Sequence, residues 1–203
     1  MKQRIVWWMK ALCAGVLICF LLSLCGFEGA CEDIGDRVLR LHIIAHSDSA
    51  EDQQMKLKVR DELTKTTDRL FGSCQSKEEA SALCRDCLPE LQEAAEECLR
   101  QNGCDLPVTV RLAEIPFDTR VYEEFSLPAG TYEALQVTIG EGKGHNWWCV
   151  LYPAVCVAAS GEDIGSALTP QETDIVQNSG RYQIGFRCVE WFQSLHQRRR
   201  WTP

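Results

Sequence analysis

The residues of this chain best suited to covalent chemistry are its cysteines. Cys149 could act as a nucleophile if a histidine activated its thiol. Cys149 sits inside the apolar run "NWWCVLY", where strand alternation would direct it inward, so a buried or disulfide-bonded cysteine is the favoured interpretation. The candidate bases for such a nucleophile are His42, His46, His145 and His196.

A second possible reactive pair is Cys84 and Cys87, which have the spacing of a redox motif. Both fall within a predicted helix and on its apolar stripe, beside Leu83, Leu88 and Leu91, so core packing is the favoured interpretation. An exported cysteine-dependent enzyme, either a hydrolase or a thiol oxidoreductase, is therefore the alternative hypothesis for this chain.

Cofactor and metal chemistry find little support in the sequence. The run "GEGKGHN" lacks the spacing of a dinucleotide fingerprint, and its Lys143 is followed by glycine instead of the Ser or Thr of a P-loop. A flexible hairpin connection is favoured for these glycines. His42 and His46 have no identifiable further ligands, so we predict no metal, no cofactor and no small-molecule substrate.

The net charge is −8, and three of the basic residues precede an uncharged segment near the N-terminus. A phosphate-neutralising surface is therefore not expected, and nucleic acid is excluded as a partner.

The first 30 residues have the organisation of an export signal or a membrane anchor. Lys2, Arg4 and Lys10 precede seventeen uncharged residues, 11–27, which are "ALCAGVLICFLLSLCGF". A clean cleavage site is missing, so both outcomes stay open. In either case the rest of the chain is predicted to be exported.

The remaining chain alternates helical and strand patterns. Strands are predicted over residues 37–47 and 107–115, through Leu135, Val137 and Ile139 after a turn at Gly130, and over "NWWCVLY". The last two are predicted to pair as an antiparallel ribbon. Helices are predicted to begin near Asp48 or Ser49 and at Ser76. These elements indicate an α+β fold, in which a mostly antiparallel sheet is covered by helices on one face, after an N-terminal signal or anchor helix.

The C-terminal part is predicted as a mobile polar linker over residues 160–180, a short strand "YQIGF" and an amphipathic helix. We therefore divide the chain into residues 1–30, an α+β domain over 31–158, and a C-terminal segment over 159–203.

Cys149 and Cys156 could form a disulfide, because Pro153 turns the chain between them and export permits oxidation. Two reduced core cysteines are nearly as well supported. The cysteines outside the apolar segment are odd in number, so at least one is unpaired or pairs between chains.

Three blocks of sequence resemble the stage II sporulation protein R family of endospore-forming bacteria. They are "RLHIIAHSDSAEDQQMKLKVRDEL", "FDTRVY" and "LPAGTYEALQVTIGEGKGHNWWCVLYPAVC". The resemblance implies a signalling protein made in the forespore and exported into the space between the two septal membranes. There it would activate a membrane-embedded aspartic protease of the mother cell, which processes pro-sigma-E, and would act as a ligand and not as a catalyst.

Two groups of residues are the predicted partner-binding surface. Trp147 and Trp148 are adjacent on a strand and must point to opposite faces, so one of them, beside Asn146, could be an interface hot spot. The second group follows the first strand and consists of His46, Ser47, Asp48 and Asp52, although helix capping alone could explain these residues.

Overall fold

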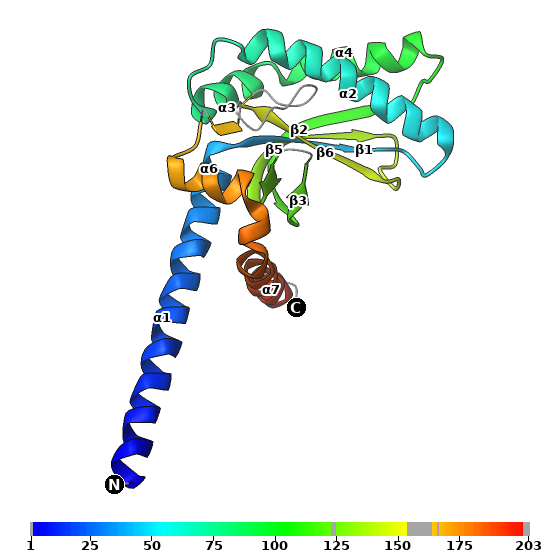
Figure 1. Cartoon of the computed structure of the whole chain (residues 1–203). Helices are drawn as coiled ribbons and strands as arrows, with labels where there is room; N and C mark the ends of the chain where they lie inside the picture. Colours follow the sequence, from blue (N-terminus) through cyan, green and yellow to red (C-terminus); the bar gives the residue numbers. More distant parts are fainter. Residues whose placement is uncertain (1, 123–124, 154–163, 166, 201–203) are drawn as a thin grey trace.

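The computed structural model describes residues 2–122, 125–153, 164–165 and 167–200. A four-stranded sheet with the strand order β2-β5-β1-β6 is its centre (Figure 1). Strands β1 and β5 are parallel, and the β1–β6 and β2–β5 pairs are antiparallel, so the predicted α+β class with a mostly antiparallel sheet is confirmed. The strands are β1 (Leu39–Ile44), β2 (Val108–Phe117), β5 (Gly130–Ile139) and β6 (Asn146–Tyr152).

The predicted antiparallel ribbon between β5 and β6 is wrong. Strand β1 lies between them and pairs with both, so the connection over residues 140–145 crosses the end of β1. Strand β1 is buried on both faces, with Leu41 and Ile43 on one side and Arg40 and His42 on the other, as the central position of a sheet requires.

Helices α2 (Ala50–Phe71), α3 (Lys77–Asp86) and α4 (Leu88–Gln101) cover one face of the sheet (Figure 1). Ser49 and Ser76 cap α2 and α3 by accepting hydrogen bonds from the backbone N–H groups of Asp52 and Glu79. Pro89 lies in the first turn of α4, so α3 and α4 are two separate helices.

The opposite face is covered in part by the end of α1 (Lys2–Arg37), by α6 (Pro170–Gln177), by α7 (Gln183–Arg200), and by the small β3–β4 pair. Strands β3 (Arg120–Val121) and β4 (Ser126–Leu127) form this pair.

Two predictions for the C-terminal part are wrong. Within the predicted linker, residues 170–177 form α6, because Thr169 and Glu172 make a reciprocal capping box with Pro170 in the first turn. The predicted strand "YQIGF" falls mostly in α7, where Phe186 and Val189 lie on one buried face at helical spacing.

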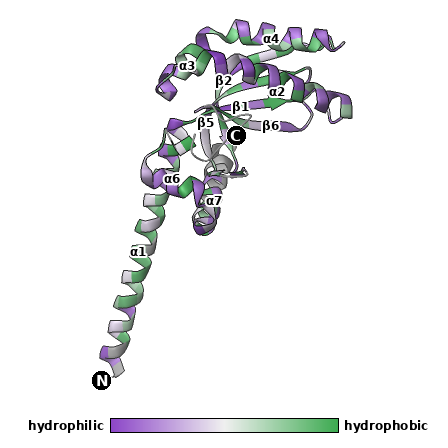
Figure 2. Cartoon of the chain, turned by 45° about the horizontal axis from the view of Figure 1, so that its top comes forward, coloured by the Kyte–Doolittle hydropathy of each residue, from purple (hydrophilic) through white to green (hydrophobic). Residues whose placement is uncertain are grey.

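Helix α1 projects from the domain and is mostly hydrophobic along its projecting length (Figure 2). It is long and apolar enough to cross a membrane, as a signal sequence near an N-terminus would also be. The helix continues without a break into the domain, where Ile34 is fully buried. The apolar helix is thus compatible with either a signal or a membrane anchor.

Candidate functional site

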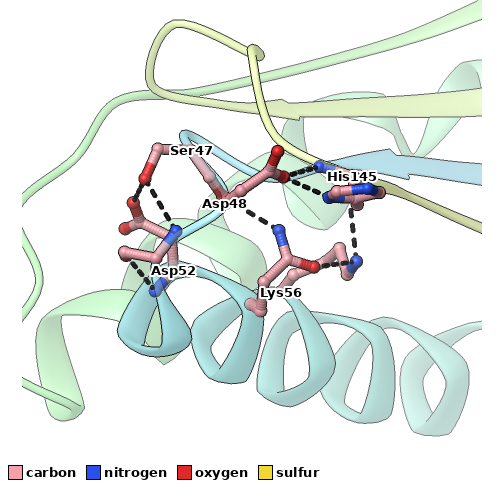
Figure 3. Close-up of polar contacts among 7 residues, drawn as sticks. Ser47, Asp48, Asp52, Lys56 and His145 are labelled. Atoms are coloured by element: carbon pink, nitrogen blue, oxygen red, sulfur yellow. Dashed lines mark hydrogen bonds and ion pairs between the residues drawn. The ribbon is translucent and has the colours of Figure 1, made fainter.

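Most of the predicted partner-binding residues meet where β1 ends and α2 begins (Figure 3). The β5–β6 loop lies against the β1–α2 loop at this point, which brings His145 and Asn146 beside residues almost a hundred positions earlier. We call this group the loop cluster; its members are His46, Ser47, Asp48, Asp52, His145 and Asn146.

Main-chain hydrogen bonds join the two loops. Lys143 N donates to the carbonyl oxygen of His46 at 3.1 Å, and Gly144 N donates to that of Ala45 at 3.0 Å. His46 Nδ1 accepts from the backbone N–H of Glu141 at 3.0 Å. Bonds between backbone groups fix the loops relative to each other, so the surface is preorganised.

Asp48 and His145 form the exposed part of the loop cluster. The backbone N–H of His145 donates to Asp48 Oδ1 at 2.6 Å, and His145 Nδ1 contacts the same oxygen. Their side chains keep 55% and 77% of their surface exposed, respectively, so both remain accessible to a partner. Beneath them, the buried Lys56 donates to His145 O at 2.9 Å and to Gln53 Oε1 at 2.6 Å.

Ser47 and Asp52 organise the start of α2 (Figure 3). Ser47 Oγ donates to Asp52 Oδ2 and accepts from Ser49 N at 3.2 Å. Of the two predicted helix starts, Asp48 and Ser49, the structure has Ser49, whose side chain accepts from the backbone N–H of Asp52. Because the Ser47 hydroxyl donates to a carboxylate and not to an imidazole, it is not arranged as the nucleophile of a Ser-His-Asp triad.

These bonds predict a specific dependence of stability on pH. The backbone N–H of His145 lowers the pKa of Asp48, and the Ser47 hydroxyl lowers the pKa of Asp52. A lowered folded-state pKa gives stabilisation that is present above the unfolded-state value of about 3.9 and is lost as the pH falls through the folded-state value. We expect the thermal midpoint to fall with acidification over that interval, and to fall less in Asp48→Asn and Asp52→Asn. Unchanged acid profiles in both variants, measured by circular dichroism, would contradict this origin.

The two tryptophans point to opposite faces of β6, as predicted, and both are half-buried. Trp148 stacks on His42 with 3.8 Å between ring centroids, and Arg60 lies 4.5 Å from the Trp147 ring. Asn146 is exposed, and its Oδ1 lies 3.1 Å from His42 Nε2. The hot-spot role of the tryptophans stays a prediction.

The Cys84 and Cys87 pair does not have the character of an activated thiol. Burial raises the pKa of Cys84 to about 12 and also raises the pKa of Cys87, which opposes thiolate formation at neutral pH. Cys149 is buried in β6. Its predicted disulfide partner, Cys156, lies outside the described residues, so that pairing stays a prediction. The described part of the chain holds no group of three or more potential metal ligands.

Sequence reasoning missed Lys56 and gave His145 only a catalytic interpretation. His145 belongs to the loop cluster, and Lys56 donates to its carbonyl oxygen, because the β5–β6 loop crosses β1, and that crossing is a tertiary feature. The available signal was the glycine spacing: Gly140 and Gly142 have positive φ angles of 56° and 61°, and Gly144 leaves room for the Ser47 carbonyl.

The fold and the site define an α+β domain attached to an apolar N-terminal helix, with a preorganised polar loop surface. The model of the stage II sporulation protein R family matches residues 35–162. The chain belongs to the stage II sporulation protein R family. It is 41% identical over 123 residues to stage II sporulation protein R of Bacillus subtilis (strain 168), and this similarity covers 61% of the chain but 55%, or about half, of that relative. No solved structure matches the chain.

The family supports a role in sporulation. Its matched region contains the loop cluster and all strands of the main sheet, and it ends before α6 and α7.

Proposed function

We propose that this protein is an exported sporulation signal that activates a membrane-bound aspartic protease of the mother cell and thereby leads to processing of pro-sigma-E. It acts as a ligand of the protease. It is made in the forespore, crosses the forespore membrane, and works in the intermembrane space.

The observation that carries this proposal is the position of the loop cluster. Strand β1 starts two residues after α1 ends and leads directly to Ala45 and His46. A six-residue strand spans about 20 Å, so the loop cluster lies roughly that far along the domain from the α1 junction. Because β1 runs across the direction of α1 (Figure 1), the loop cluster lies to one side of the anchor, at an end of the sheet that the anchor leaves free for a receptor in an opposing membrane.

The chemistry of the loop cluster fits recognition better than catalysis. Asp48 presents a carboxylate and His145 an imidazole next to the backbone bonds that join the two loops, and Asn146 presents an exposed amide at the start of β6, which pairs with β1. Such a surface would select basic and hydrogen-bonding groups on the receptor at small entropic cost. Activation then requires that these contacts form more strongly with the active state of the protease than with its inactive state.

We further propose that α1 remains attached as a membrane anchor. Phe27, at the end of the uncharged segment, stacks on Tyr182 with 5.7 Å between ring centroids and contacts Phe186 at 5.5 Å. Cleavage after Ala30 would remove Phe27 from this aromatic group. Retention of α1 is supported by that packing.

The test is reconstitution in a host that lacks all three components. We expect cleavage of the sigma-factor precursor when this chain, with α1, is produced together with the protease and the precursor. Asp48→Ala and His145→Ala should reduce cleavage strongly, because each removes an exposed group of the loop cluster. Glu93→Ala, at an exposed position on α4, is the matched control and should leave cleavage unchanged.

Export and folding of each variant are checked by membrane fractionation and protease protection. Cleavage that persists in Cys149→Ser supports the ligand and opposes the cysteine-dependent enzyme. If the correctly exported chain leaves the precursor uncut beside a working protease, the proposed function is wrong. If the loop-cluster variants behave as Glu93→Ala does, the contact surface lies elsewhere.

A further inference from the structure

Helix α7 has two faces of different character. Phe186 and Val189 are buried against the domain, and Gly185 lies against the ring of Phe27. Ile184 and Trp191 are 74% and 59% exposed, and they are seven residues apart, so two helical turns place them on the same side. Two large exposed hydrophobic side chains on one stripe indicate a surface that contacts something apolar.

The position of α7 is fixed by its contact with α1. Tyr182 and Phe186 surround Phe27, the last residue before the first acidic side chain of α1, Glu28. The start of α7 therefore lies where α1 changes from apolar to charged sequence. In Figure 1, α7 is seen almost along its axis while α1 is seen lengthwise, so α7 runs across α1 (Figures 1 and 2).

This geometry matches the interface of a membrane that α1 spans. The end of the apolar segment marks the boundary of the hydrocarbon, and a helix running across α1 at that level lies in the plane of the bilayer surface. Tryptophan is enriched at this depth, and arginine can extend from it toward the headgroups.

The charge of α7 indicates that the lipid it contacts is anionic. Its sequence carries Glu190 as the single acidic residue, against four arginines. The exposed Arg187 stands between Ile184 and Trp191 on the same stripe. An excess of arginine attracts a helix to the surface of an anionic membrane. The four arginines are Arg187, Arg198, Arg199 and Arg200.

We infer that α7 is an interfacial helix that lies on the anionic surface of the membrane anchored by α1, with the stripe of Ile184, Arg187 and Trp191 against the lipid. The inference rests on the proposed membrane anchor. It adds a second attachment that fixes the tilt of the domain and so the direction in which the loop cluster faces. The matched family region ends at residue 162, so this attachment belongs to a part of the chain outside it.

The test uses the full chain in vesicles that contain an anionic phospholipid, with lipids brominated in the upper part of the acyl chain as quenchers of tryptophan fluorescence. The fluorescence of Trp191 is the difference between the wild-type chain and Trp191→Phe. We expect bromolipid to remove most of this difference. The corresponding difference for Trp148→Phe, a residue on β6, should be unaffected.

Membrane anchoring by α1 is measured independently, through the fluorescence of Trp7 and Trp8, which are exposed on α1. If the Trp7→Phe/Trp8→Phe difference is quenched and that of Trp191 is not, the anchor stands and the interfacial helix is overturned. If none of these differences is quenched, the anchor fails and the inference fails with it.

The charge requirement has its own control pair. Arg187→Glu should weaken quenching of Trp191 in anionic vesicles, whereas Arg100→Glu, exposed on α4 on the far face of the sheet, should not. Equal quenching in both variants, or in vesicles with zwitterionic lipid alone, would overturn the assignment of an anionic surface.

Discussion

Gly144→Ala is expected to lower the free energy of unfolding by about 1–3 kcal/mol, the usual cost of forcing an extra carbon into a packed position. A Cβ at residue 144 would overlap the carbonyl oxygen of Ser47 and would lie 3.0 Å from the Ala45 side chain. A backbone oxygen cannot move aside as a flexible side chain can, so the two loops must separate. We expect loss of the Gly144 N to Ala45 O bond and loss of precursor cleavage together.

Gly180→Ala is the matched control, because a Cβ there would meet nothing within 4 Å and its φ is not positive. Chemical denaturation of both variants gives the comparison, and amide exchange of the loop residues reports separation of the loops. If Gly144→Ala is as stable as Gly180→Ala and still triggers precursor cleavage, the loop crossing has no role in organising the loop cluster.

Much of the fold follows from local signals in the sequence. The Ser76 cap with Glu79, and Pro89 in a first turn, mark real helix starts. The alternation of Val108 and Val110 marks the buried side of β2. These features depend on a few neighbouring residues, and their energetics are local.

The order of the strands could not be predicted in the same way. A glycine-containing loop between two apolar strands favours a hairpin, and β1 takes the place between them because Leu39, Leu41 and Ile43 are all completely buried. Tertiary burial therefore overrode the local hairpin signal. The site was predicted only in part for the same reason: Ser47 and Asp52 are neighbours on one segment, while His145 reaches Asp48 only through the crossing loop.

For helix α6 the local signal was correct, and the prediction of a linker was wrong. Thr169, Pro170 and Glu172 form a complete start signal, but the surrounding glycines and polar residues favoured a linker. The helix-start signal was present, but the segment lacks the apolar periodicity on which a helix prediction depends. Ile175 and Val176, both buried, are adjacent and so give little periodic pattern.

Arg40 is the least expected residue of the core. It lies on β1, is completely buried, and its Nη2 donates to the hydroxyl of Tyr122 at 2.7 Å. Its Nε and Nη1 have no hydrogen-bond partner among the described residues. The guanidinium carbon lies 3.8 Å from the centroid of the Phe117 ring and 4.9 Å from that of Tyr132. Aromatic faces therefore surround this cation, and burial lowers its pKa.

The hydrogen bond between Arg40 and Tyr122, the one side-chain bond that Arg40 makes within the described part of the chain, makes a double-mutant cycle informative. Tyr122→Phe is expected to lower the free energy of unfolding by about 1.5–3 kcal/mol, because the charged guanidinium then loses its neutral acceptor inside the core. In an Arg40→Met background the same substitution should cost less than about 0.5 kcal/mol, since the charge that requires the hydroxyl is gone and the remaining effect is that of an independent site.

Methionine at residue 40 keeps an unbranched chain between the Phe117 and Tyr132 rings, so the background variant should fold. Urea denaturation of the four proteins measures the coupling. Equal costs of Tyr122→Phe in the two backgrounds would show that the hydroxyl stabilises the β3–β4 region on its own, and that Arg40 is supported by its aromatic neighbours alone.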